Sequence, residues 1–156
     1  MALPDLTTDG WLPPGLHAAP MAEVEARFGG GAARQRHLEL LRQVVTAARS
    51  YETIKRVLLW GSFVSAKPEP NDLDYSLVVS VFHHTTVVAP EHRRFFVPFD
   101  ARQFYGVDRG YLVIPDYPLE RHTELLDFVC RDRHRSPNEI VEINLRGEFA
   151  VDRVVP

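Results

Sequence analysis

Two kinds of hydrophobic pattern alternate along the chain, and together they predict a sheet packed against helices. Apolar residues recur at three- and four-residue steps within residues 32–50, which predicts an amphipathic helix. Shorter helices are expected at residues 21–28, before a run of glycines, and 90–96, with a further amphipathic helix at 119–131. Dense apolar runs predict strands at residues 54–60, 73–82, 107–114 and 140–145. Because helices and strands interleave, we expect a single α/β (α+β) domain with a mixed sheet flanked by helices.

Polar positions within these segments refine the picture. The arginines of the 32–50 helix fall mostly outside its apolar stripe, so we expect them in solvent: Arg34, Arg36, Arg42 and Arg49. In residues 140–145, Glu142 and Asn144 share one face with Ile140 and alternate with apolar neighbours. This pattern predicts a half-buried strand, plausibly at an edge of the sheet.

The first residues differ from the rest of the chain. Residues 1–20 contain four prolines and two glycines, a composition that predicts an extended arm. Trp11, Leu12 and Leu16 give this arm apolar side chains, so we expect it to dock on the domain formed by residues 21–156.

Composition and charge narrow the possible environments. The 156 residues are 45% hydrophobic and 25% charged, as expected for a globular domain with a real core. The net charge of −3 points to no overall nucleic-acid or membrane surface. One cysteine excludes an internal disulfide, and no stretch suggests a signal peptide or a membrane span. We therefore expect a cytoplasmic protein.

The candidate chemistry lies between the two central strands. An apolar run ends at Trp60 and is followed at once by Gly61 and Ser62, a turn whose backbone N–H groups suit an anion. The next strand is entered through Asp72 and Asp74, which strand-like alternation places on one face. Neighbouring carboxylates repel unless a cation lies between them. This stretch therefore predicts a place where a divalent metal meets a phosphate.

This arrangement resembles the signature of the nucleotidyltransferase superfamily, which includes polymerase-beta-like and minimal nucleotidyltransferases. The matching residues are Trp60-Gly61-Ser62 and, after residues 63–71, Asp72-Leu73-Asp74. The arm, with Gly10-Trp11-Leu12-Pro13-Pro14-Gly15, also resembles that of uncharacterised bacterial nucleotidyltransferase-like proteins.

The resemblance implies a nucleotidyltransferase-like sheet and a metal-dependent transfer of a nucleotidyl group from an NTP to a hydroxyl acceptor. The acceptor would be an RNA end, a protein side chain or a small molecule. Asp72 and Asp74 would be catalytic ligands of a two-ion Mg²⁺ site, and Gly61, Ser62 and Lys67 would bind the nucleotide phosphates. Minimal members often belong to toxin–antitoxin or defence pairs, which implies a partner protein.

A third carboxylate, also implied by the resemblance, is expected on a later strand. The sequence offers Asp108, at the start of the 107–114 segment, as the third catalytic and metal-binding residue. Asp100 and Asp116 are alternatives.

Other readings compete with this one. Ser62 could be a nucleophile, although the second glycine of a nucleophile elbow is missing. His83 and His84 could bind a transition metal, but adjacent strand residues point to opposite faces. A different class of function keeps the fold without turnover: a catalytically inactive module that binds a partner protein, as an antitoxin does.

Overall fold

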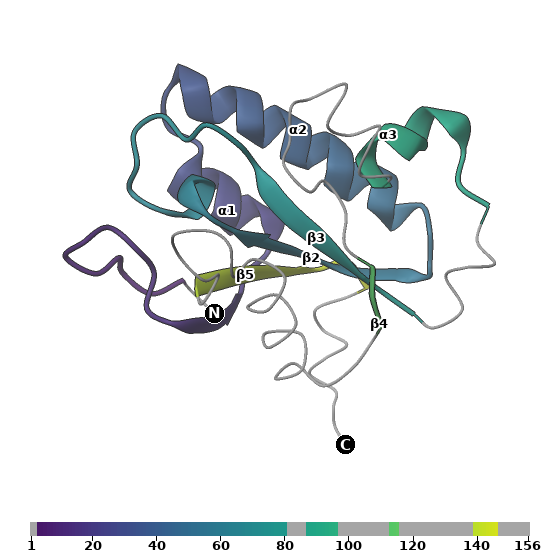
Figure 1. Ribbon diagram of the computed structural model, residues 1–156, viewed down its shortest axis with the longest axis horizontal. Coiled ribbons are helices and arrows are strands. Elements are labelled where there is room, and N and C mark those ends of the chain that lie inside the picture. The colour runs from purple at the N-terminus through teal and green to yellow at the C-terminus, as the bar shows by residue number, and fades with distance from the viewer. Residues whose placement is uncertain (1–2, 81–86, 97–112, 116–138, 147–156) are drawn as a thin grey trace.

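A computed structural model describes residues 3–80, 87–96, 113–115 and 139–146 of the chain, and its five strands form one sheet (Figure 1). The strands are β1 (Gly15–Ala18), β2 (Ile54–Trp60), β3 (Asp74–Val79), β4 (Val113–Pro115) and β5 (Glu139–Asn144). The helices are α1 (Met21–Phe28), α2 (Ala32–Arg49) and α3 (Arg93–Phe96), with 3-10 turns η1 (Ser62–Val64) and η3 (Pro90–His92). None of the helices described is long and apolar enough to span a membrane.

The sheet is mixed, in the order β1-β5-β2-β3-β4. The antiparallel strand β2 lies between β3 and β5, while the outer pairs β1–β5 and β3–β4 are parallel. The expected α/β (α+β) class with a mixed sheet is therefore confirmed.

Most predicted elements agree closely with the structure. The α1 helix has the expected bounds, α2 ends one residue earlier than predicted, and β2 coincides with residues 54–60. The expected short helix at 90–96 is divided into η3, with proline in its first turn, and α3. Of the strand expected at 107–114, the described part is β4, and the helix expected at 119–131 lies outside the described residues.

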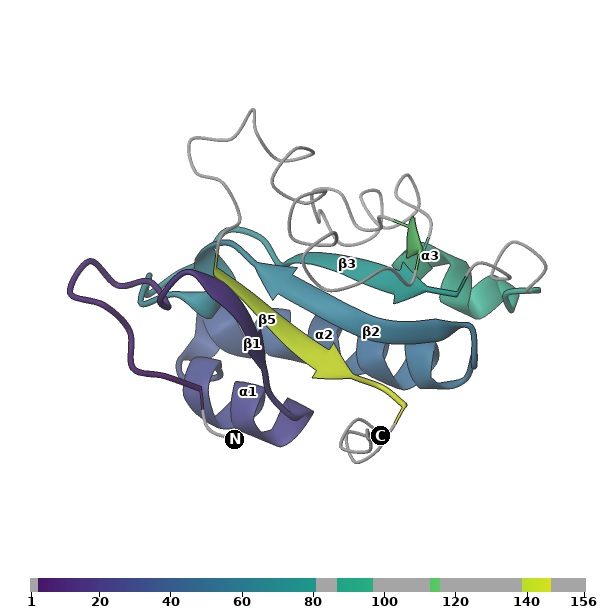
Figure 2. The same cartoon turned by 90° about the horizontal axis from the view of Figure 1, so that it is seen from below.

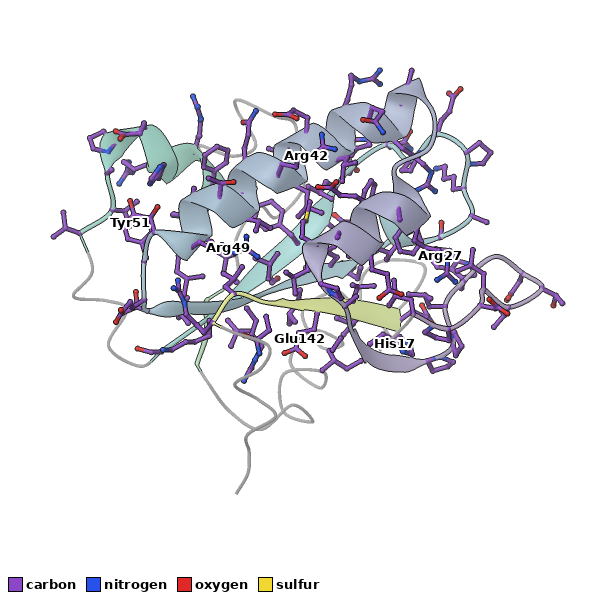
Figure 3. The ribbon with its side chains drawn as sticks, turned by 180° about the vertical axis from the view of Figure 1, so that it is seen from behind. His17, Arg27, Arg42, Arg49, Tyr51 and Glu142 are labelled. Atoms are coloured by element: carbon purple, nitrogen blue, oxygen red, sulfur yellow. The ribbon has the colours of Figure 1, made fainter. Side chains whose placement is uncertain are left out.

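The position of β5 differs from the expectation of a half-buried edge strand. It lies between β1 and β2, and five of its six residues are buried. The buried carboxylate of Glu142 forms an ion pair with Arg56 on β2, with 2.9 Å between Oε2 and Nε, and this pairing compensates for its burial. Figure 3 shows Glu142 on the side of the sheet away from α2. The edge position belongs instead to β1, formed by residues of the predicted arm.

The described core lies between the sheet and the two longer helices, which cover one face of it (Figures 1 and 2). Alternate strand residues face the helices, so Leu59, Tyr75 and Val141 join the buried residues of α2 in one cluster. The stripe predicted for α2 supplies its side of this core: Leu38, Leu41, Val44, Val45 and Ala48.

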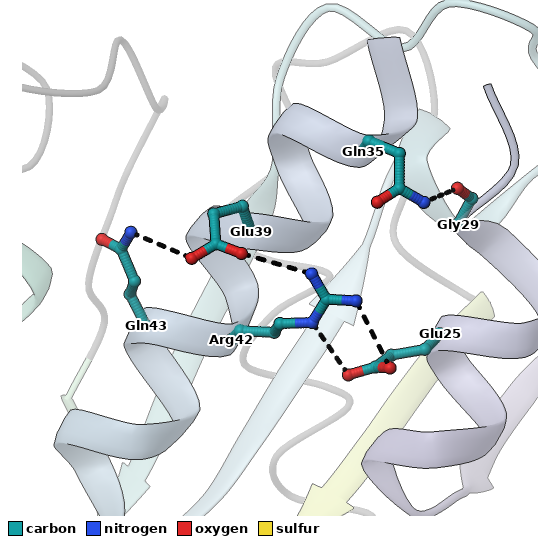
Figure 4. A network of polar contacts seen from close by, with 6 residues as sticks. All are labelled: Glu25, Gly29, Gln35, Glu39, Arg42 and Gln43. Atoms are coloured by element: carbon teal, nitrogen blue, oxygen red, sulfur yellow. Dashed lines mark hydrogen bonds and ion pairs between the residues drawn. The ribbon is translucent and has the colours of Figure 1, made fainter. Parts of the chain in front are cut away.

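A polar network joins α1 to α2 on their outer side (Figure 4). Arg42 donates to Glu25 (3.1 Å) and to Glu39 (3.2 Å), and Gln43 donates to the second oxygen of Glu39 (3.4 Å). Hydrogen bonds to Glu25 and then Glu39 raise the pKa of the Arg42 guanidinium. The network links α1 to the middle of α2.

The arm contacts the domain through its backbone and two buried leucines, Leu3 and Leu12. Arg27 of α1 donates to the carbonyl oxygens of Leu3 and Pro4. Farther along, the N–H of Ala66 donates to the carbonyl of Gly10 (2.9 Å), beside a bridge between Trp11 and Ser65. The arm therefore lies against the loop that follows β2.

Candidate functional site

The Gly61-Ser62 pair forms a sharp turn at the end of β2. Gly61 has φ +84°, a left-handed conformation that disfavours any residue with a Cβ atom. Ser62 then begins η1, in which the N–H groups of Val64 and Ser65 donate to the carbonyls of Gly61 and Ser62 at 3.2 Å each. Phe63 and Val64 are buried, which anchors the turn on the core.

The same glycine lies directly beside a carboxylate of the candidate site. Because β2 and β3 are antiparallel, Trp60 pairs with Asp74, and Gly61 follows immediately. A Cβ atom placed on Gly61 would lie 2.5 Å from Oδ2 of Asp74, closer than such atoms ever come. The turn and the carboxylate therefore share one small space that only glycine leaves open.

Asp74 is the first residue of β3 and Asp72 lies two residues before it, in a stretch where buried and partly exposed residues alternate. Both are half-exposed, whereas Leu73 and Tyr75 between and after them are buried. Tyr75 belongs to the core under the helices, so the two carboxylates lie on the opposite side of the strand. Ser76 follows on that side, fully buried, and among the described residues its Oγ has no hydrogen-bond partner.

A buried arginine holds the loop that joins the turn to these carboxylates. Arg34, in the first turns of α2, is only 7% exposed and donates four hydrogen bonds to main-chain carbonyl oxygens. The accepting carbonyls are those of Phe28 (3.2 Å), Phe63 (2.7 Å), Ser65 (2.6 Å) and Lys67 (2.5 Å). Burial lowers the pKa of Arg34, but a guanidinium remains protonated at neutral pH.

One turn farther along α2, His37 holds the far end of the same loop. Its Nε2 donates to the carbonyl of Pro70 (2.8 Å), and its ring meets that of Phe63 edge-on at 6.1 Å. Arg34 also lies over Phe63, 5.7 Å from the ring centre. The loop is thus fixed at several points between Gly61 and Asp72.

The expectation that the arginines of α2 are solvated is wrong for Arg34. Arg36 and Arg49 are exposed, whereas Arg34 lies under the loop. Its position in the helix indicates burial. Arg34 precedes Leu38 by four residues and therefore continues the apolar stripe toward the start of the helix. A charged residue in that register needs buried polar partners, which the loop carbonyls supply.

The other predicted residues are distributed as follows. The side chain of Lys67 is exposed, although its main chain is held by Ser65 Oγ and Arg34. Asp108 and its alternatives Asp100 and Asp116 lie outside the described residues, as do His83 and His84. Within the ranges that the structure describes, no three His, Cys, Asp or Glu side chains form a group that could hold a metal ion. The described part therefore brings together the turn and Asp74, with Asp72 on the same side of the chain as Asp74.

Fold and site together define an α/β domain with a glycine turn set against a carboxylate at the start of the neighbouring strand. The chain belongs to a family of unknown function, DUF6932, whose model matches residues 4–144. The match runs from the arm to the end of β5, so arm, turn and carboxylates lie within one family unit. No curated protein and no solved structure matches the sequence.

Proposed function

We propose that the protein is a metal-dependent nucleotidyltransferase that moves a nucleotidyl group from an NTP to a hydroxyl acceptor. The observation that carries the proposal is the contact between Gly61 and Asp74. A glycine turn allows a phosphate to approach backbone N–H groups closely, and a carboxylate beside it suits a divalent cation bound to that phosphate.

In the reaction, the acceptor oxygen forms a bond to the α-phosphorus as the bond from that phosphorus to pyrophosphate breaks. Pyrophosphate leaves with the bonding electron pair, and the proton of the acceptor hydroxyl passes to solvent. In this proposal Gly61 and Ser62 hold phosphate oxygens through N–H and hydroxyl groups. The exposed Lys67 contributes positive charge from the following loop.

The described residues supply two of the three carboxylates expected for a divalent metal site. Asp72 and Asp74 supply hard oxygen ligands on one side of β3, and the lack of a Cβ atom on Gly61 lets the carboxylate of Asp74 lie against the turn. Asp72 and Asp74, with Asp108 as third carboxylate, would hold two Mg²⁺ ions, which supply charge stabilisation at the entering and leaving oxygens when bound. Asp108 shortly precedes β4 in the sequence, and β4 is paired directly with β3.

The acceptor class follows from the same chemistry: an RNA end, a protein side chain or a small molecule with a free hydroxyl. The resemblance to minimal nucleotidyltransferases favours an acceptor or partner within a toxin–antitoxin or defence pair in the cytoplasm.

The test is transfer of label from each α-³²P-labelled NTP in a lysate from cells that lack the protein. Wild-type protein with Mg²⁺ should label a discrete species, and Asp74→Asn should reduce this by about a hundredfold or more. Glu69→Gln, an exposed carboxylate of the same loop, is the matched control and should label normally.

Two results would oppose the proposal. Equal labelling by Asp74→Asn and wild type would place the activity in another site or a contaminant. Absence of labelling with all four NTPs, in both lysate and purified RNA, would favour the inactive, partner-binding alternative. Asp108→Asn separately tests the third carboxylate, and unchanged labelling there would move that role to Asp100 or Asp116.

A further inference from the structure

Side chains of α2 hold several main-chain carbonyl groups of the loop from Gly61 to Pro70, beside the contacts that the arm makes with Ser65 and Ala66. Arg34 donates hydrogen bonds to three carbonyl groups of the loop, those of Phe63, Ser65 and Lys67. His37 donates one to the carbonyl of Pro70. These are main-chain contacts, so they set the path of the backbone regardless of which side chains the loop carries.

Arg34 is poorly explained by stability alone. A guanidinium that is 7% exposed is costly to bury, and in the described structure carbonyl oxygens, not a carboxylate, receive its hydrogen bonds. An apolar residue in the same stripe position would extend the core at lower cost. What the arginine adds is geometry, because its planar fork fixes several acceptors at once.

We propose that Arg34 is the positioning residue of the candidate site: it sets the path of the loop that joins the Gly61-Ser62 turn to Asp72 and Asp74, and His37 fixes the end of that loop before Asp72. Arg34 acts on the backbone of the loop. Its effect on catalysis rests on the proposed function. The geometric part stands independently of that function.

The geometric part is tested by hydrogen exchange, read by mass spectrometry, on Arg34→Lys and Arg34→Met. In either variant the peptide covering residues 61–70 should exchange about tenfold faster or more, since hydrogen bonds from a charged donor are worth at least that factor. Peptides from β2 and β3 should be unchanged. Arg36→Lys and Arg36→Met, exposed on the same helix, are the matched controls.

Unchanged exchange in the loop of both Arg34 variants would overturn the proposal. A uniform increase over the whole domain would also overturn it, because that pattern means loss of global stability. Arg34→Lys keeps the charge and most of the volume, so it separates the two cases if Arg34→Met fails to fold.

The catalytic part is tested by steady-state transfer kinetics on the same variants. Arg34→Lys should raise the KM for the nucleotide and lower kcat/KM by about ten- to a hundredfold, as expected for a slight misplacement of a binding loop. A merely structural role would instead lower the active fraction, and so kcat, with KM unchanged. If exchange responds as expected but wild-type protein transfers nothing, the proposed function fails and the positioning of the loop stands.

Discussion

Asp74 lies so close to Gly61 that Oδ2 of the carboxylate occupies the space next to a missing Cβ atom. The contact arises because β2 ends and β3 begins at the same level of the sheet, where Trp60 and Asp74 are paired. Two properties of glycine are used at once, its left-handed φ and its lack of a side chain. A single position therefore links the turn to the carboxylate.

Replacing that glycine should damage both stability and function. Gly61→Ala places a methyl group against Asp74 and forces alanine into a positive φ, which should cost about 1–3 kcal/mol of unfolding free energy. Urea denaturation measures this cost, and transfer activity should fall further than the folded fraction does. Gly30→Ala is the control, because nothing lies within 4 Å of its Cβ position and it should be nearly neutral. Equal stability of the two variants would mean that the turn tolerates a side chain.

Metal binding should be visible without any turnover. If Asp72 and Asp74 bind Mg²⁺, saturating metal at about 100 times Kd stabilises the fold by about 2.7 kcal/mol and raises Tm by roughly 5–10 °C. Thermal unfolding of the wild type in MgCl₂, against NaCl of equal ionic strength, measures the shift. Asp72→Asn and Asp74→Asn should lose most of it, whereas Glu69→Gln should keep it. A shift of the same size in all four proteins would place the metal elsewhere.

The sequence was sufficient for the elements whose contacts are local. The bounds of α1, α2 and β2 follow from apolar repeats that remain intact, and these repeats also place Asp72 and Asp74 on one side of β3. The closeness of turn and carboxylate follows from two strands adjacent in sequence. These features need no knowledge of distant parts of the chain.

The sequence does not predict which strands pair when they lie far apart in the chain. The register of β1 on β5 joins residues 15–18 to residues 139–142, and nothing in either segment identifies the other as its neighbour. The alternation of polar and apolar residues in 140–145 predicts an edge strand, because the sequence does not show that Glu142 forms an ion pair with Arg56 of β2. The role of Arg34 was hidden for a different reason: its acceptors are main-chain carbonyls, which every residue carries, so the loop bears no recognisable partner.

The hydroxyl of Tyr51 should stabilise the segment that leads into α3. Tyr51 lies just beyond α2 (Figure 3), where its Oη accepts a hydrogen bond from the N–H of Ala89 (2.9 Å) and shares one with Nδ1 of His92 (2.7 Å). Tyr51→Phe removes both bonds but keeps the ring contacts with His92 and Phe96, so it should cost about 1–2 kcal/mol. Urea denaturation gives the total, and hydrogen exchange should increase mainly in the peptide covering residues 87–96. An unchanged peptide would mean that ring packing alone holds the segment.

Arg146 should stabilise the C-terminal end of α2 from across the sheet. It follows β5, and its Nη2 donates to the carbonyls of Ala48 (3.1 Å), Arg49 (3.2 Å) and Tyr51, while Nε donates to Ile54 (3.0 Å). The last carbonyls of a helix lack partners within it and carry partial negative charge, so a guanidinium there supplies both hydrogen bonds and favourable charge. Arg146→Gln should therefore lower the unfolding free energy by about 1–3 kcal/mol, and Arg146→Lys, which keeps only the charge, by less. Urea denaturation measures both, with the exposed Arg36→Gln as a control expected within about 0.5 kcal/mol of wild type. Equal stability of Arg146→Gln and Arg36→Gln would show that water replaces the arginine at these carbonyls without cost.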